Sequence, residues 1–293
     1  PPPPPPPPLS KSHAPHRQTH VLRRRQRQMC IRDSHKHFED GRAQLRKRKT
    51  YDQQLHEIRD FFSRARAYAD GEPTKRDLRM EAMKGLFVDG DRKAAGATTL
   101  YIHANDAKQI AEVIRFKRAE GLDRVVLVGG VDSWMLADPL RENDIAVMVQ
   151  RTHSVPRFAE DDIDLPYKLP KLLEDEGVEY CLQGEGRMPE MNTRNLPFFA
   201  GTAVAHGLEY EQAIRALTLS TARILGIDDV CGSLEPGKDA TLFISGGDAL
   251  DMMGNEVQHA WVQGRDVVLD NKQIQLYEKY KAKYDAQRAA DGR

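Results

Sequence analysis

Two short segments near the carboxyl terminus decide the fold: Gly-Ser-Leu-Glu-Pro-Gly-Lys-Asp-Ala-Thr-Leu-Phe-Ile at residues 232–244 and Val-Gln-His-Ala-Trp-Val-Gln-Gly-Arg-Asp-Val-Val at residues 257–268. Pro236-Gly237 is a turn pair, because proline presets φ and glycine supplies positive φ. The apolar run 240–244 has the length of a strand, and residues 257–268 alternate as two strand pieces joined at Gly264-Arg265. The pattern predicts a small β-structure attached to a larger body.

Upstream of these segments, apolar strands alternate with amphipathic helices. Strands are expected at residues 99–103, 124–129, 145–149 and 178–182. Helices are expected at residues 106–118, 132–142, 166–176, 191–205 and 210–225, with others at about 38–68, 78–87 and 271–288. Continuous apolar strands that alternate with helices are typical of parallel βαβ units, so the sequence predicts an α/β domain.

The two carboxyl-terminal segments, together with Ala-Ile-Arg-Ala-Leu-Thr-Leu-Ser-Thr-Ala-Arg-Ile-Leu-Gly at residues 213–226, resemble metal-dependent amidohydrolases of the imidazolonepropionase-like kind. The resemblance covers about residues 50–285. It implies an α/β fold with a partial (β/α)8 TIM-type barrel, strands five to eight, and a small C-terminal β-sandwich segment. The expected domains are a half barrel at 50–231, the sandwich segment at 232–270 and a C-terminal helix at 271–293. The first four barrel strands are then not part of this chain, which corresponds to the C-terminal half only.

Residues 1–49 are expected to be a disordered tail outside the fold, because eight prolines and a His/Arg/Gln-rich run offer no periodic apolar face. Met-Cys-Ile-Arg-Asp-Ser at 29–34 back-translates to ATG TGT ATA AGA GAC AG followed by a pyrimidine, which resembles the mosaic-end adapter of transposon-based sequencing libraries. We therefore expect about the first 34 residues to be out-of-context translation, with a genuine basic tail as the alternative. The pair His35-Lys36-His37 is not taken as a metal site, because it lies in this stretch and is not expected to leave a strand.

The overall composition excludes several classes of protein. Among 293 residues, 44 basic and 44 acidic side chains balance, which gives no general attraction to nucleic acids or anionic membranes. The three cysteines form no paired framework, and no apolar run approaches the roughly 20 residues of a membrane span. We expect a small-molecule substrate as partner, and self-association into a homo-oligomer because half a barrel leaves open sheet edges. Neither the cytoplasm nor the bacterial periplasm is favoured as the compartment.

The working groups of (β/α)8 enzymes lie at the carboxyl ends of strands, which selects His103, Arg151, His153 and Glu185. Metal-dependent hydrolysis needs imidazoles and carboxylates that converge on a divalent ion with an open position. By resemblance, His103 in Leu-Tyr-Ile-His-Ala matches the fifth-strand metal ligand, and zinc is the metal expected in the intact protein. Glu185 follows the eighth strand, where the family has an aspartate. Glu185 and His153 are predicted as catalytic residues, and Arg151 as a substrate-binding residue.

Each of these assignments has a structural alternative. His103 could be a buried histidine bonded to the backbone, His153 a loop histidine, and Glu185 a solvated carboxylate. The sixth strand ends in Val-Gly-Gly at 128–130 without the family's histidine. The resemblance implies that the intact protein is a hydrolase that acts on non-peptide carbon–nitrogen bonds through a metal-activated water. This chain alone is expected to be inactive. The alternatives are a non-catalytic barrel that serves as a binding or subunit-interface scaffold, and a nucleic-acid binder based on the basic residues 11–49.

Overall fold

The computed structural model describes residues 34–39, 42–47, 51–71, 75–89, 96–184 and 189–290. The chain divides into two compact units. The first unit consists of the described residues up to Gln150 together with Leu169–Gln183. The second unit consists of Arg151–Lys168 together with the described residues from Gly184 onward.

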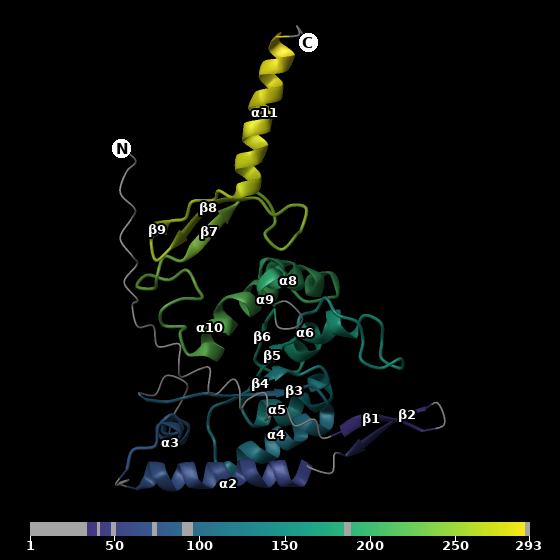
Figure 1. Ribbon diagram of the computed structural model, residues 1–293, viewed down its shortest axis with the longest axis vertical. Helices are drawn as coiled ribbons and strands as arrows, with labels where there is room; N and C mark the ends of the chain where they lie inside the picture. The colour runs from purple at the N-terminus through teal and green to yellow at the C-terminus, as the bar shows by residue number, and fades with distance from the viewer. Residues whose placement is uncertain are drawn as a thin grey trace, which may run out of the picture. The chain divides into compact units, whose positions relative to one another are not determined.

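The first unit is built on a four-stranded parallel sheet (Figure 1). Its strands are β3 (Leu100–Ala104), β4 (Val125–Gly129), β5 (Ile145–Val149) and β6 (Tyr180–Leu182), in the order β3-β4-β5-β6. Each strand lies beside the preceding strand in sequence, as in a (β/α)8 barrel and unlike a doubly wound sheet, in which the order reverses. The predicted α/β class and parallel sheet are confirmed, and the order is consistent with part of a TIM-type barrel.

Helices connect successive strands of this sheet. α4 (Ala107–Glu120) leads from β3 to β4 and contacts both, and η2 (Ser133–Leu136) with α5 (Ala137–Glu142) leads from β4 to β5. α6 (Leu165–Asp175) precedes β6. α4 ends where Gly121 adopts a left-handed φ of 55°, a conformation that glycine adopts without the steric cost of a Cβ. β4 is buried along its whole length, which explains its uninterrupted apolar sequence.

α2 (Tyr51–Asp70) packs against α4 and against the short helices α3 (Leu78–Glu81) and η1 (Lys84–Phe87). The rings of Phe62 in α2 and Phe116 in α4 meet edge to face, with 5.0 Å between their centroids. The Arg66 side chain of α2 also donates a hydrogen bond to the backbone carbonyl of Glu120 at the end of α4. These contacts hold α2 against the helical layer of the first unit.

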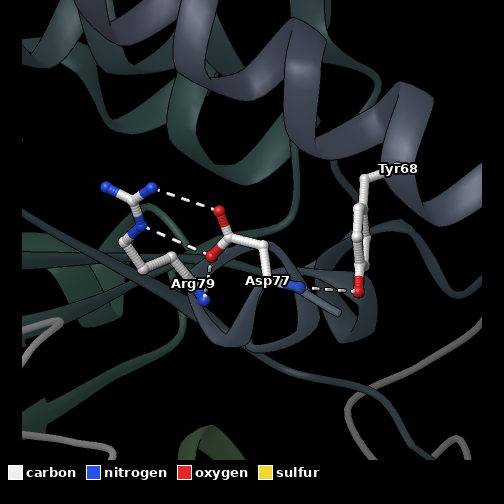
Figure 2. Close-up of polar contacts among 3 residues, drawn as sticks. All are labelled: Tyr68, Asp77 and Arg79. Carbon is white, nitrogen blue, oxygen red and sulfur yellow. Dashed lines mark hydrogen bonds and ion pairs between the residues drawn. The ribbon is translucent and has the colours of Figure 1, made fainter. Parts of the chain in front are cut away.

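Figure 2 shows how α3 begins beside α2. The Asp77 carboxylate accepts hydrogen bonds from the Arg79 backbone N–H at 2.9 Å and from the Arg79 guanidinium at 3.1 Å, which caps the helix. The Arg79 side chain, followed by its backbone N–H, holds the pKa of Asp77 below its usual value. The Tyr68 hydroxyl accepts from the Asp77 backbone N–H at 3.3 Å and donates to the Glu81 carboxylate at 3.0 Å. One tyrosine thereby ties both ends of α3 to α2.

The amino-terminal hairpin departs from the prediction. β1 (Ser34–Glu39) and β2 (Arg42–Lys47) pair in antiparallel fashion within the range 1–49 that was expected to lack structure, and the helix predicted from about residue 38 begins only at Tyr51. The overlooked signal is Asp40-Gly41, a dipeptide favoured in two-residue hairpin turns. Residues 1–33, which hold nearly all of the adapter-like segment, lie outside the described residues.

The second unit contains a group of short helices: α7 (Pro189–Asn192), η3 (Thr193–Asn195), α8 (Leu196–Ala205), α9 (Tyr210–Leu217) and α10 (Leu219–Leu225). α8 packs on α9, and α9 contacts α10. The helix predicted at 210–225 is divided at Thr218, whose φ of −116° and ψ of −88° lie outside the helical region. None of the described helices in either unit has the length and apolar composition needed to cross a bilayer.

An antiparallel sheet of β7 (Leu242–Ser245), β8 (Val257–Val262) and β9 (Arg265–Asp266) follows, and α11 (Lys272–Ala290) ends the described chain. Gln263 and Gly264 connect β8 to β9 with φ values of 52° and 74°, as a type I′ hairpin turn requires. The predicted strands and terminal helix are therefore present. Among the described residues the sheet is a single layer, so the β-sandwich stays a prediction.

Candidate active site

His103 lies next to the end of β3, in the first unit. Side chains alternate between the two faces of a strand, so half-buried His103 lies on the face opposite to the buried residues Leu100, Ile102 and Ala104. Across the sheet, His103 pairs with Val128, Val128 with Met148, and Met148 with Cys181. The residues in line with His103 across the sheet therefore have two apolar side chains and one buried thiol, that of Cys181.

A small hollow borders His103 between α2, β3 and α4. Its lining includes the polar residues His103, Gln109 and Glu112, but most of it is apolar and is formed by Leu55, Ile58, Ile102, Ala104, Val113 and Phe116. A surface of this composition suits an apolar group better than a hydrated ion, because an unpaired charge is costly to bring against apolar side chains.

The described residues do not fit a divalent metal on their own. No three His, Cys, Asp or Glu side chains within the described part of the chain are placed to hold a metal ion. Catalytic zinc sites use three protein ligands and an open position. Further ligands for a metal at His103 would have to come from outside the described residues.

The end of β4 disfavours a side chain. Gly129 and Gly130 have φ values of 101° and 63°, which L-residues rarely adopt. A Cβ on Gly129 would lie 2.4 Å from Oδ1 of Asn105, and one on Gly130 would lie 2.8 Å from Cγ1 of Val147. Glycine at both positions is therefore favoured by the backbone conformation as well as by the space available. Oδ1 of Asn105 is itself buried, without a hydrogen-bond partner among the described residues.

Arg151, Thr152 and His153 follow β5 and belong to the second unit. The fully buried Thr152 hydroxyl donates a hydrogen bond to the backbone carbonyl of Phe199 at 3.0 Å. The His153 ring lies edge-on to the Phe199 ring, with 4.8 Å between centroids. This segment is thus anchored to α8.

The His153 ring also contacts α8. Its Nε2 lies within hydrogen-bond distance, 2.6 Å, of Oγ1 of Thr202, whose hydroxyl donates to the Phe198 carbonyl at 2.9 Å. Burial lowers the pKa of His153, and the positive charge of Arg151 lowers it further against the opposing effect of the Phe198 carbonyl. His153 is therefore neutral at pH 7.

The structure brings two of the predicted site residues into one unit. Arg151 and His153 lie together in the second unit, whereas His103 belongs to the first. Glu185 lies outside the described residues. The expectation that His35-Lys36-His37 does not belong to a strand is wrong, because these residues lie within β1. β1 pairs with β2, however, and is not part of the parallel sheet.

Comparison with known proteins defines the class. The sequence profile of the amidohydrolase family matches residues 69–267. The amidohydrolase from Thermotoga maritima MSB8 is 27% identical, with a TM-score of 0.64 over 75% of this chain and 56% of that chain. The N-acetylgalactosamine-6-phosphate deacetylase of Escherichia coli O157:H7 is 44% identical over 59 residues, 20% of this chain and 14% of that protein.

The parallel α/β fold and these similarities place the protein in a class of hydrolases that are in general metal-dependent. The chain belongs to the amidohydrolase family. It spans little more than half the length of the Thermotoga maritima protein and a much smaller share of the curated relative.

Proposed function

We propose that the protein hydrolyses non-peptide carbon–nitrogen bonds of small molecules with a water activated by a divalent metal, zinc being the expected ion. The observation that carries this proposal is the family match over residues 69–267, on a sheet whose strand order is that of a barrel. In this proposal β3 to β6 are the fifth to eighth barrel strands, and β7 to β9 are one layer of a sandwich. This chain would then be the carboxyl-terminal part of the enzyme.

The proposed roles of individual residues rest on their positions. His103 would be the fifth-strand metal ligand, with the remaining ligands outside the described residues. Glu185 and His153 would be catalytic, and Arg151 would bind the substrate. The lowered pKa of His153 supports this role, because a neutral imidazole has one ring nitrogen that can accept a proton.

The choice of substrates for a test comes from the curated relative. That relative is described as a deacetylase of an N-acetylated sugar phosphate. N-acetylated amino acids and amino sugars are therefore the first compounds to assay, with amine release as the readout.

The experiment uses protein expressed from the genomic reading frame that contains this chain, loaded with zinc. We expect amine release from at least one of these compounds. A chelator or the His103→Ala substitution should abolish this release. The control His259→Ala changes a surface-exposed histidine of β8 and should retain activity. A zinc-loaded, folded protein that hydrolyses none of the compounds would count against a deacetylase and in favour of the scaffold alternative, which the family comparison does not favour.

A further inference from the structure

Arg151 carries a positive charge for which the described chain provides no counter-ion. Its side chain is partly buried, and its Nε is buried without a hydrogen-bond partner. Among the described residues no ion pair or hydrogen bond to the guanidinium is found. A buried N–H donor such as this Nε is costly to leave without an acceptor, and an acceptor that carries a negative charge would also pair with the guanidinium.

The position of Arg151 is fixed by its neighbours in sequence. Thr152 is bonded to the Phe199 carbonyl, and His153 to the Thr202 hydroxyl, so both residues that follow Arg151 are held by α8. Arg151 is therefore presented from an anchored segment. Because His153 is neutral, Arg151 supplies the positive charge of this pair.

Two acidic side chains of the same segment are engaged elsewhere. Asp161 accepts a hydrogen bond from the Phe158 backbone N–H at 3.0 Å, and Asp164 pairs with Lys168 at 2.8 Å. Neither is bonded to Arg151 in the described structure. Among the described residues, then, no acceptor is found for the donors of the Arg151 guanidinium.

We propose that Arg151 binds an oxyanion, a carboxylate or a phosphate, and that the substrate of the protein is a small molecule that bears such a group. The planar fork of a guanidinium matches both groups and can bind either with two parallel hydrogen bonds. The assignment to a substrate rests on the proposed function, whereas oxyanion binding at Arg151 does not.

The test is a titration of the 293-residue chain, isotopically labelled with ¹⁵N, that follows the arginine Nε–Hε signals by NMR. Sodium acetate and inorganic phosphate are the two probes, each added at constant ionic strength against chloride. The Arg151 signal is assigned from its loss in Arg151→Lys. We expect a saturable shift of this signal with at least one probe, and the stronger probe distinguishes a carboxylate site from a phosphate site.

Two variants sharpen the test. Arg151→Lys keeps the charge but loses the fork, and should weaken binding about tenfold, measured by calorimetry with the stronger probe. Arg157→Gln changes an exposed arginine of the same segment and should leave affinity unchanged. A linear, unsaturated shift with both probes, or equal affinity in wild type and Arg151→Lys, overturns the inference.

The oxyanion site at Arg151 and the proposed hydrolysis can fail independently, and the two assays distinguish these cases. Saturable binding at Arg151 in a protein that hydrolyses no N-acetylated compound upholds the oxyanion site and counts against the proposed hydrolysis. Hydrolysis without oxyanion binding at Arg151 upholds the activity and removes the oxyanion site.

Discussion

Replacing Gly129 by alanine tests whether the end of β4 is closed to side chains. A φ of 101° should cost an alanine about 1–3 kcal/mol. The new Cβ would lie 2.4 Å from Oδ1 of Asn105, the end of a side chain that can rotate, and 3.3 Å from the Ala104 carbonyl oxygen, so relieving this overlap should cost about 0.5–1.5 kcal/mol more. The free energy of unfolding should therefore fall by about 1.5–4.5 kcal/mol.

Two glycines serve as matched controls in the same urea unfolding assay followed by circular dichroism. Gly96 has a φ of 77° but no atom within 4 Å of a built Cβ, so Gly96→Ala should show the backbone cost alone. Gly184 has neither positive φ nor a neighbour within 4 Å, so Gly184→Ala should be neutral or stabilising by up to about 1 kcal/mol. The expected order of destabilisation is Gly129, then Gly96, then Gly184.

Equal urea midpoints for Gly129→Ala and Gly184→Ala would refute this reasoning. The end of β4 could then accept a side chain without a measurable loss of stability. If Gly129→Ala lost no more stability than Gly96→Ala, the cost of positive φ would be upheld, but the steric cost of the added Cβ would be ruled out.

Three further results are expected. Arg124 is 4% exposed and donates hydrogen bonds to the backbone carbonyls of Gly85 at 2.8 Å and Val88 at 2.6 Å. Arg124→Met should therefore lower the free energy of unfolding by about 2–4 kcal/mol, whereas Arg115→Met on the surface should lower it by under about 0.5 kcal/mol. Equal losses for the two variants in urea unfolding would contradict this. His153 should titrate below 6.5 by NMR, since burial and then Arg151 lower its pKa, and Arg151→Gln should raise it. Its contribution to stability is present above the unfolded pKa near 6.5 and is lost as pH falls through the folded pKa, and a titration at or above 6.5 would disprove the assignment. Phe243 and Ile244 of β7 are 51% and 49% exposed, so light scattering should detect self-association, which a stable monomer would rule out.

Local sequence signals predicted most of the elements. The four strands of the parallel sheet lie within two residues of their predicted ends, because each is a short apolar run bounded by polar or glycine residues. The hairpin of β1 and β2 was not predicted, because Asp40-Gly41 is flanked by charged residues without an alternating apolar pattern. The break at Thr218 could not be predicted, because residues 210–225 read as one continuous amphipathic helix.

The candidate site was less predictable, since it depends on contacts between distant residues. Position at a strand end selected His103, but no pattern indicated that Asn105 would lie against Gly129. The bond between His153 and Thr202 joins residues 49 positions apart, and an isolated threonine in a helix carries no local signal for it.

Zinc binding measures directly whether His103 is a metal ligand of a hydrolase whose other ligands lie outside the described residues. The measurement is the zinc bound per protein, by elemental analysis after dialysis, for the product of the genomic reading frame and its His103→Ala variant. We expect wild-type protein to bind zinc in stoichiometric amount and the His103→Ala variant to lose all or part of it. Stoichiometric zinc that is unchanged in His103→Ala, or no zinc in the folded wild-type protein, would contradict it.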